Sequence, residues 1–133
     1  ESKDREIGEG ALKGLSKGNV FNSCGLYSLD QSASIIEQSL AVVSNDTGLM
    51  HIAAALNKPI ESIWGNTIPA FGMYPYVPEK PSLSVISEVK GIKCRPCSKL
   101  GYKKCPKKHF KCMMDQDEEV IAESISNIIP QSL

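Results

Sequence analysis

The fold of this chain is decided by one stretch, Ser44-Asn45-Asp46-Thr47-Gly48-Leu49-Met50-His51. It lies between an apolar run at residues 40–43 and small apolar residues at 52–56, and this order predicts a strand that passes directly into a helix. The first turn of a helix presents unpaired N–H groups and about half a positive charge, so it can hold a phosphate. The three residues before Gly48 are types that begin helices, and the glycine lets a ligand approach. We therefore predict an anion site at this turn.

Hydrophobic spacing and turn residues predict that helices and strands alternate along the rest of the chain. The expected helices cover residues 2–18, 28–40, 48–56 and 117–129, the last ended by Pro130, and the expected strands cover residues 20–24, 40–44, 60–64 and 83–86. The strand at 40–44 is apolar without alternation, which predicts that both of its faces are covered. The helix at 48–56 is apolar nearly all round and is expected to be buried.

Alternating strands and helices with short connections predict an α/β fold, a Rossmann-like parallel sheet flanked by helices. Ligands bind such sheets beyond the carboxyl ends of the strands, where the turn at 46–51 and the loop at 65–75 both lie. The sequence contains neither a Walker A loop nor a G-x-G-x-x-G motif. It therefore does not support a P-loop NTPase or a simple dinucleotide oxidoreductase.

The length of 133 residues is that of a single domain with a real core, and we expect residues 1–133 to form one. The chain begins at Glu1 without a signal-like leader, and we expect it to be a fragment of a longer protein. The sequence lacks an apolar run of about 20 residues that would cross a bilayer. The expected location is the cytoplasm, with peripheral contact with a membrane left open.

Charge is distributed unevenly along this chain of zero net charge. Residues 90–112 hold nine of the 15 basic residues and no acidic residue. Such a segment predicts a polyanionic partner or a neighbouring acidic surface, and intramolecular charge compensation explains it equally well.

Four of the five cysteines, Cys94, Cys97, Cys105 and Cys112, fall in the same segment, with His109 near the last. Thiolates at this spacing can bind zinc, and the lysines around them favour the thiolate form. Two disulfides, or four reduced thiols, are the other readings, and the sequence does not decide between them. The fifth cysteine, Cys24, is expected to be a small buried residue of a strand.

Several of these residues resemble the ADP-heptose:lipopolysaccharide heptosyltransferase family. The resemblance covers about residues 2–75 and rests on Gly25-x2-Ser28-Leu29, on the stretch from Val42 to Leu56 with its Asp-Thr-Gly-x-x-His turn, on Pro59, and on Trp64-Gly65-Asn66-Thr67-Ile68-Pro69. It implies a glycosyltransferase-B architecture of two Rossmann-like domains, of which this chain is the carboxyl-terminal, donor-binding one. Where the family often has Gly-Pro-Thr-Asp-Pro, this chain has Gly65-Asn66-Thr67-Ile68-Pro69, so a polar contact to the sugar is missing.

The resemblance also implies which residues hold an ADP-heptose-like donor. The backbone from Asp46 to Met50 would bind the diphosphate, His51 would reach phosphate or sugar, and Tyr27 would stack on the adenine. The full set of expected donor-binding residues is Tyr27, Asp46, Thr47, Gly48, Leu49, Met50 and His51. Asp4 or Glu6 would bind the ribose hydroxyls.

No cofactor, no metal and no nucleic acid is implied by the resemblance. It places the general base in an amino-terminal domain that also binds the lipopolysaccharide core acceptor, so we expect the isolated chain to bind nucleotide weakly and to catalyse nothing. Pairing with another copy to complete the sheet stays open.

Simpler interpretations stand beside these. Without the resemblance, Asp46 is interpreted first as a helix cap. His51 is equally well a core histidine and Tyr27 a packing residue, while Trp64 and Tyr74 are expected to pack. A different class of function is a zinc-stabilised, lysine-rich module at 94–112 that binds nucleic acid. Only Tyr102 and Phe110 interleave the lysines there, which is few for stacking on bases.

Overall fold

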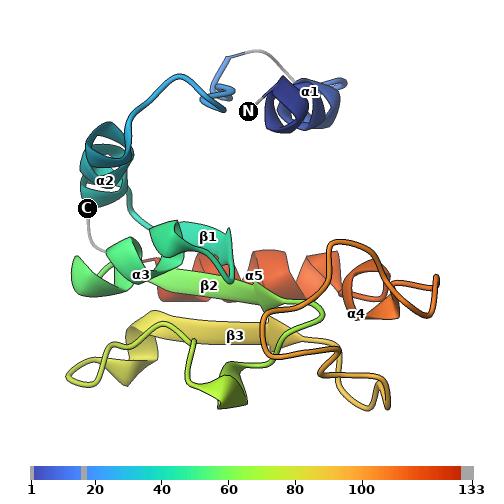
Figure 1. The fold of residues 1–133 in the computed structure, drawn as a ribbon. Helices are drawn as coiled ribbons and strands as arrows, with labels where there is room; N and C mark the ends of the chain where they lie inside the picture. Colours follow the sequence, from blue (N-terminus) through green and yellow to red (C-terminus); the bar gives the residue numbers. More distant parts are fainter. Residues whose placement is uncertain (1, 16–17, 130–133) are drawn as a thin grey trace. The chain divides into compact units, whose positions relative to one another are not determined.

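A computed structural model describes residues 2–15 and 18–129 of the chain. The chain divides into two compact units, residues 1–35 and 36–133. Figure 1 draws both.

The first helix of the first unit is α1 (Ser2–Ala11), which is shorter than the helix expected over residues 2–18. Beyond it the chain makes single turns, with the Leu15 amide donating to the Leu12 carbonyl oxygen at 3.2 Å. Gly14 adopts φ +96°, a left-handed backbone that does not continue an α-helix. Residues 16 and 17 of the expected helix lie outside the described part of the chain.

The strand expected at residues 20–24 is wrong, because this segment is irregular in the structure. The Asn22 amide group donates to the Arg5 carbonyl oxygen at 3.1 Å, and its carbonyl accepts from the Cys24 amide at 3.1 Å. These side-chain bonds compete with a strand, which also needs a partner strand to pair with. Cys24 is half-buried rather than buried.

The second helix is α2 (Leu29–Gln38), and it begins at a reciprocal cap. The Gln31 amide donates to Ser28 Oγ at 3.2 Å, and the Ser28 amide donates to Gln31 Oε1 at 2.9 Å. This capping box confirms Ser28 as the residue that starts the helix.

The second unit is built on a parallel sheet, which confirms the predicted fold class. Its strands are β1 (Val42–Asn45), β2 (Ile60–Trp64) and β3 (Ser84–Glu88), in that order across the sheet. Val42 pairs with Ile60, and Ile60 pairs with Ser84. The carboxyl ends of β1 and β2 therefore lie at one edge.

Two helices, α3 and α5, pack on the sheet. α3 (Gly48–Ala55) connects β1 to β2 and packs on both, and α5 (Glu118–Ile128) packs on β2 and runs behind the sheet in Figure 1. Asp117 caps α5, its Oδ1 accepting from the Val120 amide at 3.1 Å. Pro130, expected to end this helix, lies outside the described residues. The remaining short elements are η1 (Pro69–Phe71), η2 (Pro81–Leu83) and α4 (Lys111–Met114).

The core lies between α3 and the sheet. Its buried residues are Ile36, Met50, Ala53, Ala54, Ile60, Trp64 and Val77.

Two burial predictions from the sequence, for the strand at 40–44 and for the helix at 48–56, are wrong. Val43 of β1 is 50 % exposed and Leu49 of α3 is 40 % exposed. α3 packs on β1, whereas α5 packs chiefly on β2, so the second face of β1 lacks the cover that its composition predicts.

A buried carboxylate joins three elements in the second unit. Glu61 of β2 is fully buried, accepts from Ser87 Oγ of β3 at 2.5 Å, and accepts through its other oxygen from Ser124 Oγ of α5. A buried carboxyl group is tolerated when its oxygens are hydrogen bonded, as both are here, and the two bonds join β3 and α5 to the central strand.

We predict that Ser124→Ala lowers the free energy of unfolding by about 1.5–3 kcal/mol, the usual contribution of a hydrogen bond to a charged group. Ser126→Ala on the same helix is the matched control, because Ser126 is exposed and bonds only its own helix. Its effect should stay within about 0.5 kcal/mol. Urea denaturation of both variants measures the difference, and equal effects would show that the Glu61 contact contributes nothing.

Candidate functional site

A cavity of about 340 Å³ opens at the carboxyl ends of β1 and β2. Ligands bind parallel sheets at this edge, so its walls are the first place to look for a site. The residues lining it are Asn45, Asp46, Thr47, Ile63, Gly65, Asn66, Thr67, Leu100, Tyr102, Phe110 and Met113. Three segments far apart in the sequence therefore meet here.

The first wall is the turn that enters α3. Thr47 is the N-cap residue, with an extended backbone (φ −145°, ψ 164°), and its side chain makes no capping bond. Its hydroxyl lies 3.1 Å from Ser44 Oγ instead. The amides at the start of α3 are thus not covered by a capping side chain, and the turn before them lines the cavity.

Asp46 is not the helix cap. Its Oδ2 accepts a hydrogen bond from Thr67 Oγ1 at 3.2 Å, across the cavity edge from β1 to the loop after β2. The interpretation of Asp46 as a mere cap is therefore wrong, and the carboxylate ties two walls of the cavity together.

The other predicted donor residues lie in different places. Gly48 and Leu49 follow in the first turn of α3, and a Cβ added at Gly48 would meet open space. The Met50 side chain is fully buried in the core, and its amide donates to the Thr47 carbonyl oxygen at 3.1 Å. His51 is exposed, which overturns its reading as a core histidine. None of these four lines the cavity.

Tyr27, the predicted adenine contact, lies in the first unit and is exposed. Its role stays a prediction.

The second wall is the loop after β2, held by Arg95. The Arg95 guanidinium is 6 % exposed and donates to the Thr67 carbonyl oxygen and to Glu88 Oε2, both at 2.9 Å, and to the Val89 carbonyl oxygen at 3.0 Å. Arg95 therefore holds the loop after β2 in place through buried hydrogen bonds, and it is not part of the basic surface that the sequence predicts for residues 90–112.

The third wall comes from the segment at 94–112, which sequence reasoning did not place at the site. Asn66 fastens it: the Asn66 amide group donates to the Tyr102 carbonyl oxygen at 2.8 Å, and the Asn66 carbonyl oxygen accepts from the Cys97 amide at 3.0 Å. Leu100, Tyr102 and Phe110 then face the cavity. The available signal was the presence of large apolar side chains in an otherwise lysine-rich segment.

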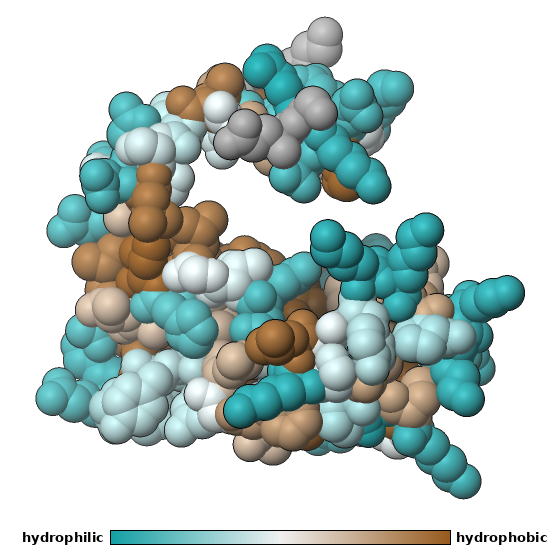
Figure 2. Space-filling view, in the orientation of Figure 1, coloured by the Kyte–Doolittle hydropathy of each residue, from teal (hydrophilic) through white to brown (hydrophobic). Residues whose placement is uncertain are grey.

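The eight lysines of residues 90–112 are all exposed. In Figure 2, hydrophilic side chains project from the part of the second unit where this segment lies. The positive charge is thus displayed outward, beside the cavity and not inside it.

The thiols of this segment sit in unequal environments, and all five cysteines of the chain are free. Burial raises the pKa of Cys97, and the nearby Cys94 and Cys105 raise it further. Burial also raises the pKa of Cys112. Backbone amides, that of Phe110 foremost, lower the pKa of Cys105. Within the described residues, no three His, Cys, Asp or Glu side chains already stand at the spacing of a metal site.

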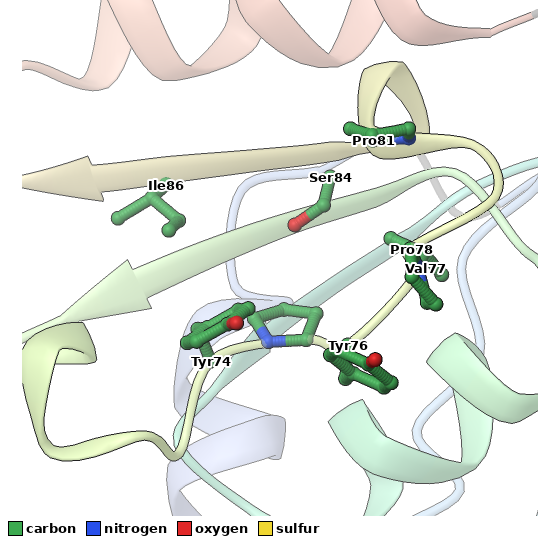
Figure 3. A pocket seen from close by; sticks show the side chains of 8 residues that line it. Tyr74, Tyr76, Val77, Pro78, Pro81, Ser84 and Ile86 are labelled. Carbon is green, nitrogen blue, oxygen red and sulfur yellow. The ribbon is translucent and has the colours of Figure 1, made fainter.

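A separate cavity of about 370 Å³ is lined by residues of β3 and of the loop before it, and it is mostly apolar. Figure 3 shows Tyr74 and Tyr76 beside it. The centres of the two rings are 6.4 Å apart, in an edge-to-face arrangement. It contains no ionisable group apart from the two phenols, so it offers little to a charged ligand. Trp64 is fully buried and packs as expected, whereas Tyr74 is partly exposed.

The comparisons with known proteins decide the family. The model of glycosyltransferase family 9 (heptosyltransferase) matches residues 1–109. The chain belongs to glycosyltransferase family 9. It is 29 % identical over 131 residues to lipooligosaccharide heptosyltransferase 2 of Haemophilus influenzae, covering 96 % of this chain and 36 % of that protein.

Two further family 9 relatives match a shorter part. Lipopolysaccharide heptosyltransferase 2 of Escherichia coli is 40 % identical over 73 residues, covering 53 % of this chain and 21 % of that protein. Lipooligosaccharide heptosyltransferase 2 of Haemophilus ducreyi is 42 % identical over 74 residues, covering 52 % and 21 %. The chain thus spans about a third or less of the length of these relatives. No solved structure matches it.

None of the described helices is both long and apolar enough to span a membrane.

We predict that Cys105 is alkylated at lower pH than Cys97 or Cys112. A lowered pKa leaves more thiolate at a given pH, and the thiolate is the nucleophile. The measurement is iodoacetamide labelling of the reduced chain in the presence of a chelator, with the rate at each cysteine followed against pH by peptide mass spectrometry. A Cys97 profile that rises at lower pH than that of Cys105 would contradict the assignment.

Proposed function

We propose that this chain is the donor-binding part of a family 9 glycosyltransferase and that its cavity at the ends of β1 and β2 receives the diphosphate of a nucleotide-sugar donor. The observation that carries the proposal is the entry into α3: its N-cap side chain leaves the first amides uncovered, and the turn before them lines the cavity. A diphosphate is the ligand such amides favour, since it brings negative charge to the positive end of the helix.

The cavity has the other features that a donor needs. Asn66 and Thr67 bring polar groups to the wall opposite Asp46, and Leu100, Tyr102 and Phe110 bring apolar surface. A nucleotide sugar combines a charged diphosphate with hydroxyl-rich and flat apolar parts, so a site with both kinds of wall suits it. Gly48, Leu49 and His51 do not line the cavity and would contact the part of the donor that extends over the first turn of α3.

For the whole protein we propose transfer of a heptose-like sugar to a lipopolysaccharide core acceptor, since the relatives are named as heptosyltransferases. Transfer needs a base that deprotonates the acceptor and a site that stabilises the leaving diphosphate. We propose that the chain supplies the second of these and that the base and the acceptor site lie in a part of the whole protein outside residues 1–133. We propose accordingly that residues 1–133 form one nucleotide-sugar-binding domain that binds a donor nucleotide without catalysing transfer, in the cytoplasm.

The sharpest test removes one backbone amide. Gly48 is the first residue of α3, where proline is well tolerated, and Thr47 before it already has the extended backbone that proline requires. Gly48→Pro should weaken ADP binding by about 10- to 100-fold, because a hydrogen bond to a charged group contributes about 1.5–3 kcal/mol. Isothermal titration calorimetry measures the effect.

Gly48→Ala is the matched control, because it keeps the amide and its Cβ meets open space. Its ADP affinity should stay within about twofold of the parent chain, well below the effect of losing a charged hydrogen bond. Unchanged ADP affinity in Gly48→Pro would contradict the proposal. So would the absence of ADP binding together with steeply salt-dependent binding of an oligonucleotide, the behaviour of a basic nucleic-acid module. Sugar transfer by the chain alone would refute its proposed lack of catalysis.

A further inference from the structure

The four cysteines of residues 94–112 gather beside the third wall of the cavity. Cys94, Cys97 and Cys105 line one hollow of about 490 Å³. Cys112, in the first turn of α4, is 5 % exposed and lies close enough to Cys97 and Cys105 to interact with both electrostatically. The segment around them has no strand and only the four-residue helix α4. Something other than regular secondary structure must hold it.

The backbone around Cys105 is shaped to receive a negatively charged sulfur. The Phe110 amide donates to Cys105 Sγ at 3.4 Å, and the amides of Lys107, Lys108 and His109 also bear on this sulfur. Lys108 and Phe110 have φ +61° and +47°, left-handed values that are uncommon outside glycine. Backbone of this kind clusters at ligand sites, and here it turns the Phe110 N–H toward the Cys105 sulfur.

His109 orients a second sulfur. The Lys111 amide donates to His109 Nδ1 at 3.1 Å, so the neutral ring carries its proton on Nε2. Nε2 lies 3.7 Å from Cys94 Sγ. His109 is therefore placed to donate a hydrogen bond to the Cys94 sulfur, which leaves the four cysteines as the candidate ligands.

We propose that Cys94, Cys97, Cys105 and Cys112 together bind one Zn²⁺ ion as four thiolates. Four cysteine sulfurs are a common donor set for structural zinc, and one pair here has the Cys-x2-Cys spacing of such sites. The amides on Cys105 and the His109 contact to Cys94 are the outer hydrogen bonds that metal-bound sulfurs receive.

Binding draws the sulfurs together. Tetrahedral Zn–S bonds of about 2.3 Å put the sulfurs about 3.8 Å apart, a spacing that protonated thiols have no reason to adopt. The four thiols release four protons to solvent as the ion binds, and the products are four Zn–S bonds with a net charge of −2. Segment 90–112 carries nine basic residues and no acidic one, so it offsets this charge.

The ion would fix the third wall of the cavity. Leu100, Tyr102 and Phe110 lie between the proposed ligands along the chain, and they line the cavity at the ends of β1 and β2. A bound ion replaces the apolar core that this segment lacks, and its binding energy becomes folding energy of the wall. The zinc site is independent of what the cavity binds.

Metal analysis of the chain tests the proposal directly. Purified from a reducing cytoplasm without added metal or chelator, the chain should contain about one zinc ion per molecule, as a closed four-ligand site holds. The zinc content of Cys97→Ser and that of Cys112→Ser should each fall at least about fivefold. Cys24→Ser is the matched control and should retain the full content, because Cys24 lies in the first unit.

Two further measurements separate loss of a ligand from loss of folding. Cobalt added to the chelator-treated chain should give the intense thiolate-to-cobalt charge-transfer band, weaker in Cys97→Ser while its far-ultraviolet circular dichroism is kept. His109→Gln should keep the zinc content but lose affinity by about 10- to 100-fold in a chelator competition, as an outer contact does. The proposal is overturned by iron in place of zinc, by a metal-free chain with two disulfides, or by equal zinc loss in Cys24→Ser.

Discussion

The parallel pairing of β1 with β2 is the constraint on which the site depends. The register that sets Val42 beside Ile60 also sets Asn45 beside Ile63, so both strands end at the same edge. A parallel pair requires a crossover, and α3 supplies it. The start of α3 therefore lies where the strands end, and the positive end of its dipole faces the same side as the loop after β2. The position of the cavity follows from this geometry, and its third wall is added by residues 100–113.

Hydrogen bonds from three side chains then hold the walls of the cavity together. Asp46 bonds Thr67 across the edge, Arg95 holds the Thr67 carbonyl, and Asn66 holds the segment that carries Tyr102. Arg95 and its partner Glu88 act within the second unit, so the charge of this arginine serves structure. The lysines around it remain outside. The segment at 90–112, which is uniformly basic in sequence, thus contains one buried structural arginine and eight exposed lysines.

Much of this architecture could be predicted from local pattern. The apolar run before Asp46, the capping residue Ser28 and the acidic start of α5 each act over a few residues, and the strands and helices they predict are present with shifted ends. The strand expected at residues 20–24 failed because Asn22 bonds nearby backbone, a competition that composition does not reveal. The exposure of Val43 and Leu49 depends on which elements cover β1 and α3, and no local pattern encodes that. The contacts of Glu61, Arg95 and Asn66 join residues that are distant in the sequence, so local pattern does not place residues 94–112 at the site, and their large apolar side chains are the one signal that the sequence offers.

The most direct test of the account is an ADP titration of the ¹⁵N-labelled chain followed by amide chemical shifts. The account predicts that the Gly48 and Leu49 amides shift most, together with those of Asp46 and Thr67, while adenosine without phosphates leaves Gly48 and Leu49 unmoved. Shifts confined to the exposed lysines of residues 90–112, with the Gly48 and Leu49 amides unchanged at saturation, would contradict it.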